Sequence, residues 1–277
     1  MKVKIAVCNR RTDKKYKNQE MDWQYISDRN KNPVRTSETA EEYPKLPKEQ
    51  RSNLKDIGGL VGGWLKGGIR KNGNVLFRTV GLLDADHVPA GFDFCGAVRE
   101  VFGDLTYFIY STHSHTPDNP RYRLVLLLSR EVSEDEYPAM LRMVAKQIGM
   151  DYFDDSTYQS NRMMYWASCP SNGEFVFDDN VGQSLDVDKY LDMYEDWRDI
   201  SQWPTSSRQS EVIKKETKVQ KNPLEKEGTV GVFCRAYPTI QEVIDEFLSD
   251  VYAPTATDSR YDYLEADSVA GVVIYDN

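Results

Sequence analysis

The alternation of apolar and polar positions predicts an α+β fold. Runs rich in β-branched and aromatic residues predict strands at residues 2–8, 76–85, 105–112, 122–129 and 174–177. Apolar residues at helical spacing predict helices within 90–102 and 134–148. Ser133 and Glu136 are spaced as a capping box at the start of the second helix, and Gly149 is placed to end it. We therefore expect a central mixed or antiparallel sheet flanked by helices, with a hairpin joining the third and fourth strands.

A polar segment divides the chain. Residues 201–228 are rich in Ser, Thr and Lys and nearly lack large apolar side chains after Trp203, which is the composition of a linker. We expect a main domain at 1–200 and a small α/β C-terminal extension at 229–277. The chain stops within an apolar, strand-like run, GVVIYDN, so we expect a longer protein that continues beyond it.

Composition narrows the class of protein. Of the 277 residues, 40% are hydrophobic and 29% charged, as in soluble globular proteins. No run approaches the roughly 18 apolar residues that span a bilayer, and the N-terminus lacks the features of a signal peptide, so we expect a cytoplasmic protein without a membrane partner. The four cysteines are scattered and there are three histidines, which favours free thiols over a zinc site.

Charge is distributed unevenly. The net charge of −9 argues against a nucleic-acid partner. However, residues 45–80 contain eight basic and two acidic side chains, whereas 178–199 contain eight acidic and two basic ones. The basic region permits an anionic ligand.

The first candidate site is Asp84 and Asp86, which follow an apolar strand. Side chains two residues apart on a strand share a face, and two such carboxylates repel each other unless a cation lies between them. Mg²⁺ and Mn²⁺ prefer oxygen ligands of this kind. A polar turn at the end of a strand is the alternative explanation.

The second candidate is Ser111-Thr112-His113-Ser114-His115, at the end of another apolar strand. If the strand persists, Ser111, His113 and His115 share a face and could hold a triphosphate. The following TPDNP sequence is typical of a turn, so a plain hairpin loop explains the segment equally well.

Two further segments carry charged residues. Asp154 and Asp155 follow the second helix and precede Arg162; a loop or capping aspartate is the alternative there. The glycine-rich stretch 58–71 contains Lys66, Arg70 and Lys71, and its glycines would allow a backbone to approach phosphates. It is not a Walker A loop, and a flexible surface loop is the alternative.

Taken in order, these segments resemble the archaeo-eukaryotic primase superfamily, whose motifs are a strand-end D-x-D/E, an S-x-H and a late acid. THSHTPDNPRYRLVL, FDDSTYQSNRMMYW and the region 230–277 are similar to the primase-polymerase branch associated with virulence-associated E-type helicases of bacteria, phages and mobile elements, and to CRISPR-associated primase-polymerases. The resemblance covers residues 50–277, whereas 9–45 resemble no family that we can name. Ala167-Ser168 replaces an expected proline.

The resemblance implies a DNA primase-polymerase that joins nucleoside triphosphates to a 3′-hydroxyl on a DNA template with two Mg²⁺ or Mn²⁺ ions. It implies Asp84, Asp86 and Asp155, or Asp154 in place of Asp155, as catalytic metal ligands. Ser111 and His113 are then expected at the triphosphate, and a helicase is expected as a partner after residue 277. From their charge we add Lys66, Arg123 and Arg162 as nucleotide contacts, and Arg70 and Lys71 as DNA contacts.

Arg121 would face the same side as Arg123, and surface ion pairs are the alternative for all three arginines 121, 123 and 162. Two other functions are compatible with the sequence. A metal-dependent nuclease or phosphatase also uses clustered acids and histidine. A catalytically inactive replication-initiator module would bind DNA and recruit a helicase, but it would have no physical need of Asp84 and Asp86.

Overall fold

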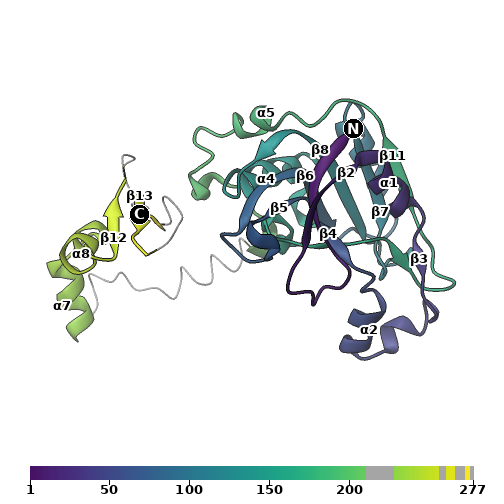
Figure 1. Cartoon of the computed structure of the whole chain (residues 1–277), viewed down its shortest axis with the longest axis horizontal. Helices are drawn as coiled ribbons and strands as arrows, with labels where there is room; N and C mark the ends of the chain where they lie inside the picture. Colours follow the sequence, from purple (N-terminus) through teal and green to yellow (C-terminus); the bar gives the residue numbers. More distant parts are fainter. Residues whose placement is uncertain (210–227, 256–259, 266–271, 275–277) are drawn as a thin grey trace. The chain divides into compact units, whose positions relative to one another are not determined.

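A five-stranded antiparallel sheet forms the centre of the main unit in the computed structural model, which describes residues 1–209, 228–255, 260–265 and 272–274 (Figure 1). The strand order is β11-β7-β8-β6-β5. Their bounds are β5 Gly63–Leu65, β6 Val75–Ala85, β7 Tyr107–Ser111, β8 Tyr122–Val132 and β11 Phe177–Asn180. The expected hairpin between β7 and β8 is confirmed, with Ile109 opposite Leu124. So is the α+β class with antiparallel sheets flanked by helices.

Both faces of this sheet are buried, and the two-residue period of the strands sorts their side chains between two cores. On one face, Leu83, Leu124 and Leu126 pack with the helices α3 (Phe94–Phe102) and α4 (Glu136–Ile148). On the other face, Leu82 and Val125 pack with α1 (Trp23–Lys31) and β1 (Lys2–Cys8). The sheet is therefore a rigid middle layer, and its strand ends are firmly placed.

The capping residues of α4 differ slightly from the prediction. The helix begins after Asp135, but Ser133 and Glu136 still exchange the two expected bonds, at 2.8 and 3.2 Å. Gly149 ends the helix with a φ of 137°, a conformation that favours glycine.

Much of the glycine-rich segment is strand rather than loop. It forms β4 (Gly59–Val61), which belongs to a second antiparallel sheet of order β2-β1-β4-β9, and then crosses into β5 of the central sheet. The strands β2 and β9 are Lys17–Asp22 and Met164–Tyr165. A Cβ at Gly63 would lie 1.8 Å from the carbonyl oxygen of Phe77. Glycine is needed there because backbones approach closely.

A long excursion, residues 32–58, leads from α1 to β4. After α1 the chain forms β3 (Val34–Arg35), which pairs in parallel with β10 (Ser168–Cys169), then the 3-10 helix η1 (Tyr43–Lys45) and α2 (Lys48–Leu54). The remaining short elements of this unit are the 3-10 helices η2 (Lys66–Gly68), η3 (Met150–Tyr152), η4 (Asp155–Tyr158) and η5 (Ile200–Gln202), and the helix α5 (Val187–Leu191). This excursion carries α2 to the edge of the candidate site described below.

The boundary of the main unit lies at Ser210, ten residues later than expected. Trp203 packs against the α3–α4 core, and Arg208 donates hydrogen bonds to the carbonyls of Asp151 and Phe153. Residues 201–209 are thus part of the folded unit, and the rest of the expected linker, 210–227, lies outside the described residues.

In the second unit, Glu211–Asn277, the residues that the structure describes form two helices and a small sheet. These are α7 (Gly228–Ala236), α8 (Ile240–Phe247), β12 (Tyr252–Pro254), β13 (Arg260–Tyr263) and β14 (Val272–Val273). These described elements are of mixed α and β type, and the domain bounds 229–277 expected from the sequence stay a prediction. No described helix has the length and apolar character that a membrane span requires.

Candidate active site

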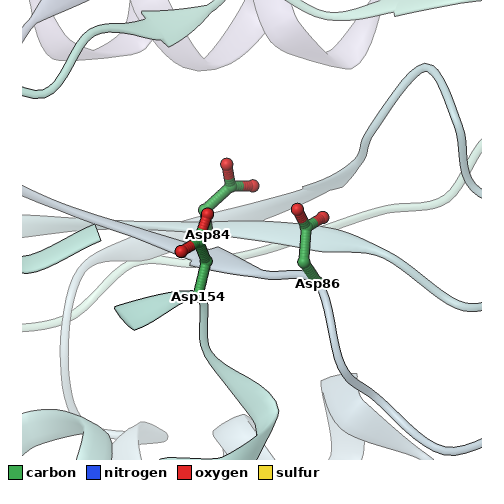
Figure 2. A group of neighbouring side chains, drawn as sticks. All are labelled: Asp84, Asp86 and Asp154. Atoms are coloured by element: carbon green, nitrogen blue, oxygen red, sulfur yellow. The ribbon is translucent and has the colours of Figure 1, made fainter. Parts of the chain in front are cut away.

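Three carboxylates meet at one end of the central sheet. Asp84 lies near the end of β6, Asp86 lies just beyond it, and Asp154 precedes η4. One carboxylate oxygen from each lies within 4.8 Å of the others (Figure 2). The expected pair from the D-x-D sequence is joined by a third acid from a segment 70 residues away.

The third acid is held in place by the backbone of β6. The Asp154 amide donates to the carbonyl of Asp84 at 2.9 Å. The buried hydroxyl of Thr157 accepts from the amide of Asp84 at 2.8 Å and donates to the carbonyl of Leu82 at 3.3 Å. The turn 154–157 is therefore fastened to the strand at the position of Asp84.

Asp155, the residue first chosen from the doublet, is not part of the acid cluster. Its Oδ2 lies 3.6 Å from Nε of Arg208, on another side of the turn. Asp154 instead caps η4 and accepts from the amide and the hydroxyl of Ser156, both at 2.8 Å. Adjacent side chains diverge at the start of a helix, so only one residue of the doublet can face the strand. The geometry selects the alternative, Asp154.

Each acid of the cluster faces an arginine. Nε of Arg123 lies 3.3 Å from Asp84, and the guanidinium groups of Arg121 and Arg162 lie 3.1 and 3.4 Å from Asp86 and Asp154. Burial raises the pKa of Asp84, and the charge of Arg123 only partly offsets this effect. These arginines therefore balance the charge of the three carboxylates.

The acid cluster is chemically suited to a divalent ion. All its donors are carboxylate oxygens, which Mg²⁺ and Mn²⁺ prefer. Oδ1 of Asp84 is buried and has no hydrogen-bond donor among the described residues, although Arg123 lies nearby. A buried oxygen without a donor is costly unless a cation is bound to it. The residues therefore fit the expected metal.

A cavity of about 650 Å³ opens beside Asp84 and Asp86, and we call it the catalytic cavity. Basic side chains dominate its walls: Arg11, Lys48, Lys55, Arg70, Arg121, Arg123 and Arg162. Asp84 and Asp86 are the acids that line it. Burial lowers the pKa of the Lys55 ammonium, which reflects how closely the walls surround it. The cavity thus combines a metal-binding edge with walls that favour anions.

Several of these cations were not singled out in the sequence. Lys48 and Lys55 come from α2 and its end, and Arg11 comes from the loop after β1. The only sequence signal for the two lysines was the basic excess of residues 45–80. No sequence signal pointed to Arg11, because it reaches the site only through the pairing of β1 in the second sheet.

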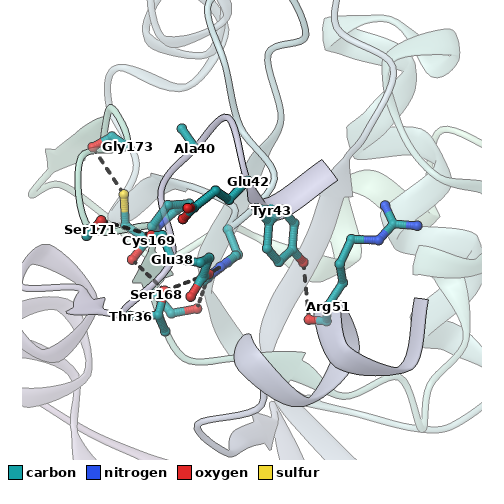
Figure 3. A network of polar contacts seen from close by, with 12 residues as sticks. Thr36, Glu38, Ala40, Glu42, Tyr43, Arg51, Ser168, Cys169, Ser171 and Gly173 are labelled. Carbon is teal, nitrogen blue, oxygen red and sulfur yellow. Dashed lines mark hydrogen bonds and ion pairs between the residues drawn. The ribbon is translucent and has the colours of Figure 1, made fainter. Parts of the chain in front are cut away.

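His113 lies at the wall of the catalytic cavity, but protein groups contact both of its ring nitrogens. Nε2 lies 2.8 Å from Oε1 of Glu38, and Nδ1 lies 2.9 Å from Oγ of Ser168. The Tyr43 ring packs at 4.5 Å. Figure 3 shows Glu38 and Ser168 within one polar network that includes the hydroxyl of Thr36. Burial lowers the pKa of His113, and Glu38 acts against that shift.

The structure brings only some of the other predicted nucleotide and DNA contacts to the catalytic cavity. Arg70, Arg123 and Arg162 line the catalytic cavity, whereas Ser111, Lys66 and Lys71 do not. Ser111 is fully buried, and its hydroxyl accepts from the amide of Val176, because the strand ends there and the following residues turn away. The expectation that Ser111 and His113 share one face is therefore not met.

Comparison with known proteins places the chain in a family. The family described as "VapE N-terminal domain" matches residues 1–206. The chain belongs to that family. The match agrees with the resemblance to the branch found with virulence-associated E-type helicases, and it includes residues 9–45, which the motifs left unassigned.

Two solved structures are similar at low identity. The AEP domain of the cyanophage S-2L primase-polymerase is 14% identical, with a TM-score of 0.38, and the match covers 69% of this chain and 87% of that one. Primase RepB′ is 13% identical, with a TM-score of 0.32, covering 90% and 72%. No curated protein matches the chain.

Proposed function

We propose that this protein is a template-dependent nucleotidyltransferase of the primase-polymerase type, which joins nucleoside triphosphates to a 3′-hydroxyl on a DNA template. The observation that carries the proposal is the position of the acid cluster, Asp84, Asp86 and Asp154, at the edge of a cavity with basic walls. A phosphoryl-transfer site needs both features, because the reaction gathers negative charge that metal ions and cations must stabilise.

Asp84, Asp86 and Asp154 would hold Mg²⁺ or Mn²⁺. Such ions supply Lewis acidity at the phosphates and favour ionisation of the attacking hydroxyl. The three carboxylates come from two segments fastened to each other through Thr157, so the protein holds them ready before substrate arrives.

The basic walls bind and orient the triphosphate. Arg121, Arg123 and Arg162 line the cavity as well as contacting the acids, so their guanidinium groups can contact phosphate oxygens while the acids engage metal. Planar guanidinium groups form paired hydrogen bonds with phosphates. Lys55 and Arg70 add charge from the other walls.

DNA, nucleoside triphosphates and a helicase region are the partners that this proposal implies. The family match names the VapE N-terminal domain and supports the helicase association. Neither of the two remaining functions considered from the sequence, nuclease and inactive initiator, is favoured by a particular contact.

Gel analysis of a primed DNA template with nucleoside triphosphates and Mn²⁺ tests the proposal. We expect strand extension by the wild type and none by Asp84→Asn. Cleavage of the DNA without any need for nucleotide would instead identify a nuclease. DNA binding without either reaction would identify an inactive initiator. Either of these two results would overturn the proposal.

A further inference from the structure

A second cavity, of about 360 Å³, lies against the same loop as the catalytic cavity. The two cavities share His113, Ser114 and Arg121 in their walls. Arg121 also contacts Asp86 at 3.1 Å, so one side chain connects the second cavity with the acid cluster. A ligand there would lie next to the reacting groups.

The walls of the second cavity contain donors and no acidic side chain. The most available hydrogen-bond donor is Arg51 on α2. Its guanidinium has no hydrogen-bond or ion-pair partner among the described residues, and its Nε is buried. The Tyr43 hydroxyl donates to the backbone carbonyl of Arg51 at 3.2 Å, which fixes the helix but leaves the side chain unused (Figure 3). An unpaired, half-buried guanidinium favours an anion.

His115 supplies a second donor of defined orientation. Its Nδ1 accepts from the amide of Arg121 at 3.1 Å, so in the neutral ring the proton resides on Nε2. Burial lowers the pKa of His115 and favours that neutral form. The Asn119 side chain lies at the rim. Apolar surfaces of Tyr43, Pro44 and Pro170 complete the walls, which suits a ligand with both a charged and a flat part.

We propose that the second cavity binds a phosphate of a second nucleotide unit, the one that presents the 3′-hydroxyl to be extended. This proposal rests on the proposed function, because only a reaction between two nucleotide units needs a second phosphate site beside the first. The ligand has two sources of the same chemistry, a free nucleotide that starts a strand and the end of an existing primer strand.

Binding of inorganic triphosphate, measured by calorimetry without DNA, tests the site independently of activity. We expect two sites in the wild type and one in Arg51→Glu. Lys45→Glu is the control for charge reversal, because Lys45 is a basic residue of η1 that lines neither cavity, and this variant should keep both sites. A single site in the wild type, or two sites in Arg51→Glu, overturns the proposal.

Activity then identifies the source. If a free nucleotide is the ligand, Arg51→Glu reduces dinucleotide synthesis on an unprimed template at least tenfold, about 1.4 kcal/mol, and leaves extension of a long primer within twofold. If the primer is the ligand, affinity for primed template falls instead.

Asn119→Asp is a second variant of nearly unchanged shape that brings negative charge to the rim, and it should act in the same direction as Arg51→Glu. A protein that extends no template but still loses one triphosphate site in Arg51→Glu would contradict the proposed function alone. Equal effects of Lys45→Glu and Arg51→Glu would contradict the second site.

Discussion

Arg123 lies directly opposite Asp84 in the antiparallel pairing of β8 with β6, with its Nε 3.3 Å from Oδ1 of that carboxylate. Both side chains are mostly buried. Although Arg123 favours the ionised carboxylate, burial dominates and raises the pKa of Asp84. The carboxylate charge is therefore unfavourable for folding in the absence of metal, which is the expected state of a ligand kept ready for a cation.

This relationship predicts that Asp84→Asn stabilises the metal-free protein at pH 8. A carboxyl with a folded pKa above its unfolded value of about 3.9 contributes stability at low pH that is lost as pH rises through the folded pKa. The variant avoids that loss, so its Tm should exceed the wild-type Tm at pH 8 and match it near pH 4. Thermal unfolding with EDTA across this range measures the effect.

Mn²⁺ provides the internal control. It should raise the Tm of the wild type and leave that of Asp84→Asn nearly unchanged, because a ligand stabilises only the state that binds it. A variant less stable than the wild type at pH 8 would mean that the ion pair with Arg123 outweighs burial.

The aspartate doublet offers a matched pair of substitutions. Asp154→Asn should reduce template extension at least a hundredfold, equivalent to about 2.7 kcal/mol in the barrier, because it removes one of three clustered carboxylates. Asp155→Asn should stay within a few fold, since Asp155 faces Arg208. Mn²⁺ titrations of both variants, monitored by calorimetry, check the metal-binding step. Loss of activity in Asp155→Asn alone would reverse our assignment.

Local sequence was enough to predict the strands that carry Asp84 and Arg123. Their apolar alternation and the turn at 116–120 act over a few residues, and the structure confirms the hairpin and the faces of both arginines 121 and 123. The choice between Asp154 and Asp155 could not be made from sequence. It depends on how Thr157 bonds to β6, a contact across 73 residues.

The position of Glu38 was also beyond local sequence. Its neighbours form only the short strand β3 and loops, and its carboxylate reaches His113 because β3 pairs with β10. The role of the glycines in 58–71 could not be decided from local sequence for a similar reason. A glycine that permits two strands to cross has the same local signature as one that permits a phosphate to approach.

Glu38 should control the protonation of His113. Replacing Glu38 with Gln keeps a hydrogen-bond acceptor but removes the charge that opposes the effect of burial, so the pKa of His113 should fall further. Lys55 and Arg123, which also disfavour the imidazolium, remain in place. The protein has three histidines, so ring resonances in an NMR titration can be assigned with little overlap. His115 should titrate as in the wild type.

An unchanged pKa of His113 in Glu38→Gln would show that the 2.8 Å contact does not persist in solution. If the hydrogen bond between Glu38 and His113 also fixes the position of the cavity wall, Glu38→Ala should raise the KM for nucleotide more than Glu38→Gln does. The conservative variant thus separates loss of charge from loss of the connection between the excursion and the sheet.

Arg70 and Lys71, at the end of the glycine-rich segment, should play different roles. Arg70 lines the catalytic cavity, whereas Lys71 is exposed outside it. Arg70→Ala should therefore raise the KM for nucleotide severalfold while leaving the salt dependence of DNA binding unchanged. Lys71→Ala should leave that KM unchanged. If Lys71 contacts a DNA phosphate, the slope of log affinity against log salt concentration should fall by about 0.9 for duplex or about 0.7 for single strands, since one fewer counterion is released.

Fluorescence anisotropy at several salt concentrations, together with nucleotide kinetics on the same two variants, measures both quantities. The division follows from the walls of the cavity alone, so identical behaviour of the two variants in both measurements would show that the cavity walls do not separate nucleotide from DNA.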